Sequence, residues 1–336
     1  MLALGSVPDL LRLLTVPILG WAAWRDVQTR RVPNRTWYPI VALGVVLLAW
    51  ELAVHLPPAG FQDRRYLVRV ALSLGFVAPL SYAFWRIGGF GGADAKALMA
   101  LALVVPTFPT YYLPTTALPM VETTLGVFSM TVLTNTVLAG LAYPLALAAR
   151  NALGGDVSKL MFLGRRVAVA DLSAAHGRLF EDGEGFTRRG LDLDALRMYL
   201  RWRGASLDAI REAPERYRDP ATIETTYDPG DGAVRDARAD GGAGAATLGE
   251  YPTGAIDDDA ALDDPWGAEA FLEAVDGSAY GTDPELLRDG LDLVTGRDEV
   301  WISPGIPFLV PMFVGLVLAF TYGDVLFGLL GALGVV

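Results

Sequence analysis

The sequence contains no cysteine and only two histidines, His55 and His176. Without thiols the chain cannot form disulfides, a thiol nucleophile or a cysteine zinc site, and two histidines do not favour a histidine-rich metal centre. We therefore expect neither a metal nor another cofactor. The 27 lysines and arginines are outnumbered by 38 aspartates and glutamates. This excess of negative charge argues against nucleic-acid binding, which requires a basic surface.

The charges are unevenly distributed along the chain. Residues 151–300 contain 31 acidic and 16 basic side chains, whereas the other 186 residues contain 7 and 11. A mean hydropathy of +0.36 is high for a chain whose net charge is −11. The chain therefore combines an apolar, slightly basic part with a strongly acidic, soluble part. So many surface carboxylates favour a halophilic source, although an acidic linker in any organism is the alternative.

Apolar stretches long enough to span a bilayer, about 17 to 25 residues, recur along the chain. They are residues 8–24, 37–54, 67–84, 97–113, 125–149 and 306–322. The tail 325–336 is shorter and fits a partial or surface-lying helix. Arg12 lies near the end of the first stretch, where a long basic side chain can reach the membrane surface.

The pattern predicts an all-α polytopic membrane protein of about six transmembrane helices, with an acidic cytoplasmic insertion before the last helix. The expected divisions are a membrane core with five spans over 1–150, the acidic segment over 151–304, and a final span with its apolar tail over 305–336. Within the acidic segment, leucines at helical spacing around 191–200 predict a helix. Residues 226–268 are rich in Asp, Gly and Ala, which indicates a flexible loop.

The short loops predict the orientation. Residues 25–36 and 86–96 lie on one side of the expected membrane and hold six basic side chains, whereas residues 55–66 and 114–124 hold two. By the positive-inside rule, the first pair of loops is cytoplasmic and the N-terminus is outside. The acidic segment then also lies in the cytoplasm.

Two aspartates are expected at the same cytoplasmic depth. Asp26 lies two residues after the first predicted span, and Asp94 lies three before the fourth, in a turn with Gly88, Gly91 and Gly92. An ionisable group at a membrane edge is a functional candidate. Taken singly, each residue is better explained by a structural role, Asp94 as a helix cap and Asp26 as the ion partner of a neighbouring arginine, Arg25 or Arg30. The two together, on one side and beside a glycine-rich turn, favour a functional role.

Two adjacent carboxylates favour one chemistry above others. Like charges cannot both ionise cheaply at short range, so the pKa of one carboxyl rises and the pair shares a proton. The ionised member can take a proton from water while the protonated member polarises a peptide carbonyl. Glycines beside the pair would let a substrate backbone approach closely.

Two motifs resemble those of the type IV prepilin peptidases. The stretch "RDVQTRRVPNRTW" (25–37) resembles their first aspartate motif, and "GGFGGADAKAL" (88–98) resembles the second, a Gly-x-Gly-Asp signature followed by a residue and Lys. Ala93 replaces the second glycine of that signature, as in the archaeal prepilin and preflagellin peptidases. The four-cysteine zinc module of many bacterial members cannot exist here, which makes peptidase activity without N-methylation the expectation.

This resemblance implies roles for seven residues. Asp26 and Asp94 would form the catalytic pair of an aspartic endopeptidase, and Gly91 and Gly92 would shape the loop that presents Asp94. Lys96 matches the lysine of the signature. The alternative is that it only anchors its helix at the cytoplasmic membrane surface by its positive charge. Pro33 and Asn34 would set the turn after the first helix. The implied substrates are prepilins and archaellin precursors, cut at the cytoplasmic membrane face.

Three other interpretations compete with this one. Intramembrane proteases of the presenilin type share the Gly-x-Gly-Asp signature, but their Pro-Ala-Leu motif is missing here. In a transporter, Asp26 and Asp94 would bind a cation, but the sequence shows neither inverted repeats nor midplane charges. In a non-catalytic membrane anchor, both aspartates would be structural.

Overall fold

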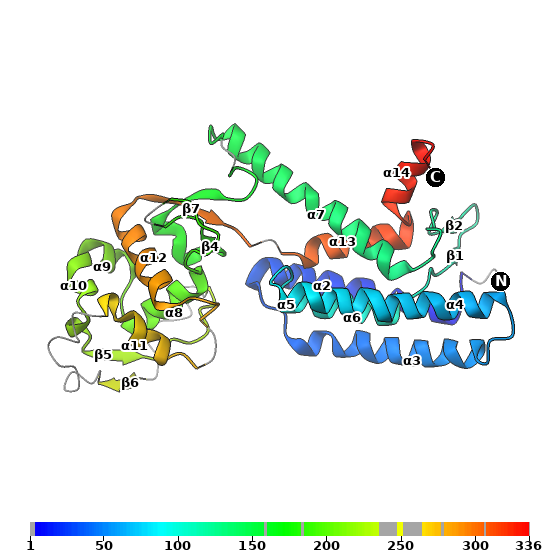
Figure 1. Ribbon diagram of the computed structural model, residues 1–336, viewed down its shortest axis with the longest axis horizontal. Helices are drawn as coiled ribbons and strands as arrows, with labels where there is room; N and C mark the ends of the chain where they lie inside the picture. The colour runs from blue at the N-terminus through cyan, green and yellow to red at the C-terminus, as the bar shows by residue number, and fades with distance from the viewer. Residues whose placement is uncertain are drawn as a thin grey trace. The chain divides into compact units, whose positions relative to one another are not determined.

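The computed structural model describes residues 4–157, 160–182, 185–234, 247–250, 264–276, 279–305 and 307–335. It divides into two compact units (Figure 1). The first unit comprises Met1–Pro144 and Ile306–Val336, and the second comprises Leu145–Gly305. Each unit has its own hydrophobic core.

The first unit is a bundle of helices with one small hairpin. Its helices are α1 (Val7–Arg12), α2 (Thr15–Thr29), η1 (Asn34–Thr36), α3 (Tyr38–His55), α4 (Phe61–Leu72), η2 (Ser73–Val77), α5 (Ala78–Arg86), α6 (Gly92–Val104), α7 (Phe128–Leu153), α13 (Leu309–Thr321) and α14 (Val325–Ala332). The hairpin pairs β1 (Tyr111–Tyr112) with β2 (Ala117–Leu118). Helices α4 and α5 continue one another through η2, a single π-helical turn.

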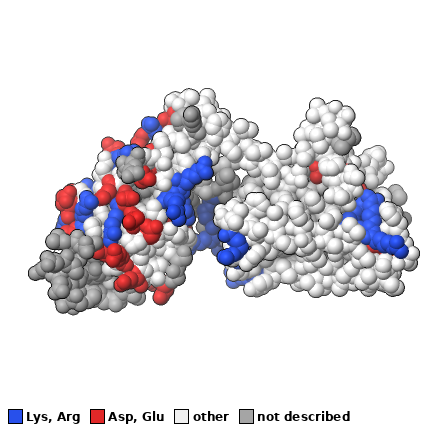
Figure 2. All heavy atoms as spheres, viewed as in Figure 1, with Lys and Arg blue, Asp and Glu red and all other residues white. Residues whose placement is uncertain are grey.

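Three helical stretches are long and apolar enough to cross a membrane. They are Asn34–His55, Phe61–Arg86 and Phe128–Leu153. On the face of the first unit shown in Figure 2, a broad uncharged surface separates charged side chains near the ends. The unit therefore has the features of a membrane-inserted bundle.

The predicted span 97–113 is wrong in its extent. Helix α6 ends at Val104, and the chain continues through an irregular segment to the β1–β2 hairpin. Pro106 and Pro109 follow directly, and a proline disfavours the helical conformation of the residue before it. Val105 accordingly has φ −127° and ψ 58°. The prediction followed the apolar composition, which continues to residue 113, whereas the helix itself ends at Val104.

Helix α6 lies at the centre of the first unit. Its alanines and leucines are buried on nearly every side, and it packs against α3 and α5. Gly44 of α3 makes the close approach possible, because a Cβ atom there would lie 2.8 Å from Cγ of Leu103. Small residues at such contacts allow apolar helices to pack tightly.

Arg12 is buried, with 2% of its surface exposed, and does not reach the membrane surface as expected. Its guanidinium lies 2.7 Å from Asp9 and 2.6 Å from Glu51 of α3, and it donates to the carbonyl of Val104 at 3.1 Å. Tyr66 of α4 donates to Glu51 as well, at 3.0 Å. This ionic cluster joins α1, α3, α4 and the end of α6.

The C-terminal helices are held against α7 by polar contacts. Thr131 donates to Asp324 at 2.8 Å, and Asn135 donates to the carbonyl of Gly323 at 2.8 Å. The Asn135 side chain also accepts the backbone N–H of Val325 at 3.0 Å. The apolar tail therefore starts with a short helix, α14, whose N-cap is Asp324.

The second unit mixes helices and strands, so the all-α expectation holds only for the first unit apart from its hairpin. An antiparallel sheet has the order β3–β7–β4, with Val167 opposite Val300. Its strands are β3 (Arg165–Ala168), β4 (Arg178–Leu179) and β7 (Glu299–Ser303), and a second pair joins β5 (Thr225–Tyr227) to β6 (Thr247–Glu250).

Helices cover a core that includes Trp202, Trp266 and Phe271. They are α8 (Leu193–Arg203), α9 (Leu207–Glu212), α10 (Pro214–Arg218), α11 (Ala268–Glu273) and α12 (Pro284–Gly296), with 3₁₀ turns at η3 (Val169–Ala174), η4 (Pro220–Thr222) and η5 (Pro265–Gly267). The leucine spacing indeed marks a helix, α8. Most of the loop predicted over 226–268 lies outside the described residues.

The Arg12 cluster yields a stability prediction. Replacing Glu51 by Gln removes one charge and leaves the buried guanidinium with one carboxylate partner. Because a broken buried ion pair typically costs about 3–5 kcal/mol, we expect Glu51→Gln to lower the free energy of unfolding by about that amount. Denaturant unfolding in detergent, followed by circular dichroism, measures this change. Arg64→Gln, at an exposed position, is the control; equal stability of both variants would contradict the prediction.

Candidate active site

Asp26 lies in the last turn of α2, with 9% of its surface exposed. The helix ends at Thr29, and the backbone N–H of the C-cap residue Arg30 donates to the Asp26 carbonyl at 3.0 Å. The carboxylate of Asp26 accepts the backbone N–H of Leu309, the first residue of α13. The N-terminus of a helix carries unpaired N–H groups and partial positive charge, so it stabilises a carboxylate.

Asp94 lies in the first turn of α6 and is partly buried. Its Oδ2 accepts the backbone N–H of Gly91, the N-cap residue, at 3.0 Å. Asp94 thus helps to cap α6, which the sequence had offered as the alternative to a functional role. Capping uses one lone pair of one oxygen, so the same carboxyl group still has acceptor capacity for chemistry.

The two carboxyl groups are close enough to influence each other's ionisation. Both lie outside the predicted spans and outside the three long apolar stretches. Burial and the negative charge of Asp26 together raise the pKa of Asp94 to about 7. Burial also raises the pKa of Asp26, but the charge of Arg30 and the Leu309 N–H oppose that rise. Near neutral pH Asp94 is therefore partly protonated beside Asp26.

In the glycine turn before α6, a side chain at one position would crowd the Asp94 carboxylate. A Cβ atom on Gly91 would lie 2.8 Å from Oδ2 of Asp94, which is shorter than a normal contact. A Cβ atom on Gly92 would meet Nε1 of Trp85 at an ordinary 3.6 Å. Gly88 adopts φ +76°, a left-handed conformation that suits glycine. Of the two glycines that were predicted to shape this loop, only Gly91 lies where an added Cβ atom would press on the Asp94 carboxylate.

The structure brings Lys96 and Asn34 together. Nζ of Lys96 donates to Oδ1 of Asn34 at 2.7 Å, so the second motif is hydrogen-bonded to the first. Pro33 precedes η1 with an extended ψ of 143°, and Asn34 begins that turn. Lys96 thereby holds α6 against the turn that leads into α3.

Two contributors to the site were predicted only in part or not at all. The sequence offered Arg30 as a possible ion partner of Asp26, but its positive charge acts on both Asp26 and Asp94. It adopts φ 54°, a conformation that is uncommon for a residue other than glycine and carries strain. Leu309 contributes a backbone N–H, for which the identity of the residue offers no signal.

No metal site is evident in the part of the chain that the structure describes. Within it, no three histidine, aspartate or glutamate side chains gather as ligands for an ion. The chemistry that the site itself offers is that of two carboxyl groups in different protonation states.

Comparison with known proteins gives matches at both ends of the chain. A family model described as the type IV leader peptidase family matches residues 13–145, which include both aspartates. A model described as the archaeal peptidase A24 C-terminus, type II, matches residues 288–325, which include Leu309. The prepilin peptidase EppA of Methanothermobacter thermautotrophicus is 27% identical over 126 residues, covering 37% of this chain and 31% of the relative. The chain thus spans about a third of that relative's length.

The apolar helical bundle is therefore similar in sequence to a family of peptidases. The two family models together cover about half of the chain, and the second is specific to archaeal members. Together with the relative, these matches support the archaeal type IV prepilin peptidase family for this chain.

The electrostatic coupling can be tested by titration. Because the charge of Asp26 helps to raise the pKa of Asp94 from its usual range to about 7, we expect Asp26→Asn to lower that pKa. Carbon NMR of labelled aspartate carboxyl groups, recorded in detergent across pH 4–9, measures the shift. An unchanged Asp94 titration in Asp26→Asn would show that the two carboxyl groups are too far apart to share a proton.

Proposed function

We propose that this protein is an aspartic endopeptidase that removes the N-terminal signal peptide of prepilins, of archaellin precursors, or of both. The observation that carries the proposal is the pairing of Asp26 with Asp94, in which the charge of one raises the pKa of the other. The family and the named prepilin peptidase relative support the substrate class. The proposal that archaellin precursors are also substrates is supported by the sequence resemblance alone.

The different surroundings of the two carboxyl groups assign their roles. Burial raises the pKa of Asp26, but the positive charge of Arg30 and the Leu309 N–H stabilise its ionised form and oppose that rise. Asp94 holds a proton near neutral pH because burial and the Asp26 charge disfavour its ionisation. Asp26 is therefore the general base and Asp94 the general acid.

The reaction then follows in two steps. Asp26 takes a proton from water as the water oxygen bonds to the scissile carbonyl carbon, and Asp94 gives its proton to the carbonyl oxygen. In the second step Asp26 returns its proton to the leaving amine nitrogen as the C–N bond breaks. Asp94 recovers its proton from the hydroxyl group as the carbonyl re-forms. Both carboxyl groups end in their starting states.

We also propose the membrane arrangement. The long apolar stretches Asn34–His55, Phe61–Arg86 and Phe128–Leu153 would cross the bilayer. Helices α2, α6 and α13 have 15, 13 and 13 residues, and at about 1.5 Å per residue they are shorter than a hydrocarbon core of about 30 Å. In a six-span arrangement, α2 and α6 would end near the cytoplasmic surface, where Asp26 and Asp94 meet water. The N-terminus would be outside, and residues 151–304 would be cytoplasmic.

The first functional test is loss of processing. With either carboxyl group replaced by an amide, proton transfer through that group is lost, so Asp26→Asn and Asp94→Asn should each reduce cleavage of a tagged prepilin by at least about a hundredfold. The measurement is a size shift on a gel, with detergent-purified variants assayed at several salt concentrations. Glu122→Gln, which neutralises an exposed carboxylate, should process normally. Undiminished cleavage by both variants would leave the aspartates as caps and ion partners.

A matched pair of glycine variants tests the geometry of Asp94. The backbone of Gly91 has φ −66°, which alanine tolerates, so Gly91→Ala acts mainly through the Cβ atom that crowds Oδ2 of Asp94. A displaced catalytic group costs one to two orders of magnitude in rate, so we expect cleavage to fall by about tenfold or more. Gly92→Ala, whose Cβ makes an ordinary contact, should retain most of the activity. Equal rates for the two variants would contradict this role of Gly91.

A further inference from the structure

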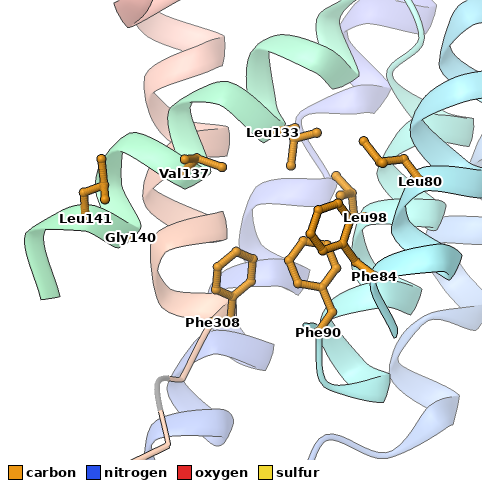
Figure 3. Close-up of a pocket in the computed structure, with 9 residues that line it drawn as sticks. All are labelled: Leu80, Phe84, Phe90, Leu98, Leu133, Val137, Gly140, Leu141 and Phe308. Carbon is orange, nitrogen blue, oxygen red and sulfur yellow. The ribbon is translucent and has the colours of Figure 1, made fainter. Parts of the chain in front are cut away.

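Exposed apolar side chains occur in both units, but the proposed membrane arrangement accounts only for those of the first. That unit contains an apolar groove of about 340 Å³, lined by residues such as Val137 and Phe308 (Figure 3). A bilayer around the helical bundle would surround such apolar surfaces. The second unit is proposed to lie outside the bilayer, so a group of exposed apolar side chains there indicates an interaction surface.

The exposed apolar side chains of the second unit lie near the end of α7. Among its described residues, nearly all the large ones lie between positions 145 and 186, and Leu153 and Leu163 are 91% and 47% exposed. Nδ2 of Asn151, in the last turn of α7, donates to the carbonyls of Met161 and Gly164 at 2.8 Å and 2.7 Å. The turn that carries Leu163 is therefore fixed to the end of α7 within the second unit.

One face of the β3–β7–β4 sheet continues this apolar surface. Alternate residues of a strand point to opposite faces, and Trp301 lies on the face away from the core of the unit. The guanidinium of Arg166 lies 5.6 Å from the centre of the Trp301 ring, and the ring of Phe186 lies 6.3 Å away. A Cβ atom on Gly164 would lie 3.1 Å from Cε3 of Trp301. We call the surface formed by Leu163, Arg166, Phe186 and Trp301 the aromatic face.

Positive charge accompanies the aromatic face, although the second unit as a whole is acidic. Residues 151–189 hold 6 basic and 5 acidic side chains, whereas residues 190–300 hold 10 and 26. Arg188 and Arg189 are exposed shortly after Phe186, and neither has an ion-pair partner among the described residues. Arg150 is exposed in the last turn of α7. The excess of carboxylates therefore belongs to the later part of the unit's sequence.

We propose that the aromatic face binds the surface of an anionic lipid bilayer, the membrane that α7 would cross. Helix α7 has 26 residues, so at about 1.5 Å per residue it is about 39 Å long. This exceeds a hydrocarbon core of about 30 Å, so the end of α7 lies among the lipid headgroups. The turn of Leu163 is hydrogen-bonded to that end and therefore lies at a similar depth. Aromatic rings favour this interfacial layer, and arginines bind its phosphates.

The charge distribution determines which side of the second unit turns toward the lipid. Anionic headgroups attract the exposed arginines and repel the carboxylates of residues 190–300. Binding through the aromatic face would thus hold the acidic part in water and limit the rotation of the unit against the membrane. Continuity with the end of α7 favours lipid over a soluble protein partner. The inference goes beyond the proposed function, because it uses the crossing of the membrane by α7 and does not depend on peptidase activity.

A change of lipid composition tests the proposal while the face keeps its charges. The chain has no cysteine, so Phe162→Cys, at an exposed position beside Leu163, can carry a single bimane fluorophore. The full-length protein is placed in nanodiscs of phosphatidylcholine with or without phosphatidylglycerol, and a lipid with a nitroxide on its headgroup quenches nearby bimane. We expect strong quenching in the anionic discs and much weaker quenching in the neutral discs. Bimane on Glu215→Cys, at an exposed position of α10, should remain unquenched in both.

Removal of charge is the second measurement. An arginine near an anionic surface contributes roughly fivefold to binding, so Arg188→Gln with Arg189→Gln should lower the ratio of bound to free face in anionic discs by about thirtyfold. Arg216→Gln with Arg218→Gln makes the same charge change at exposed positions of α10 and should leave the ratio unchanged.

Two results would overturn the proposal. Equal quenching at position 162 in neutral and anionic discs, unaffected by the arginine substitutions, would show that headgroup charge is not recognised. Absence of quenching in both kinds of disc would show that the face does not meet the membrane and is open to a soluble partner. Cleavage of prepilin, measured on the same variants, is expected to be retained, so failure of this proposal and failure of the proposed function are distinguishable.

Discussion

The placement of Asp26 and Asp94 near each other is the constraint on which the rest of the first unit depends. Two carboxyl groups at short range repel when both are ionised, so the fold must supply compensating interactions. It does so with backbone donors from two helix N-termini and with the charge of Arg30. The compensation is unequal for the two carboxyl groups, and in the proposed mechanism this difference makes Asp26 the base and Asp94 the acid.

Three distant parts of the chain must come together for that arrangement. Helix α2 carries Asp26 at its end, α6 carries Asp94 at its start, and α13 supplies the Leu309 N–H from more than two hundred residues later. The packing of α13 on α2, and of α6 on α3, is therefore part of the site. The C-terminal family match includes α13, so the second unit interrupts the chain between two parts of one site.

The other end of the bundle is stabilised by a different kind of interaction. Arg12 joins Asp9, Glu51 and the carbonyl of Val104 in a buried ionic cluster, which sets how α1, α3 and α6 align. A buried ion pair contributes little net stability but strongly disfavours arrangements that leave one charge alone. The cluster therefore favours one alignment of α1, α3 and α6 along their axes. That alignment also sets where Asp94 lies, at the opposite end of α6.

The sequence by itself determined the division into an apolar and an acidic part, most of the helices, and the two aspartates as the candidate pair. These features follow from composition, from helical spacing and from residues that are costly at a membrane edge. Tertiary structure alone decided that Arg12 is buried and that Arg30 and Leu309 act on the pair. The end of α6 at Val104 follows from a local signal, the proline at position 106, which hydropathy does not register. Hydropathy measures how a segment partitions between water and lipid, and it does not report where a helix ends. A backbone N–H is common to nearly every residue, so its role appears only when folding brings a helix terminus to a carboxylate.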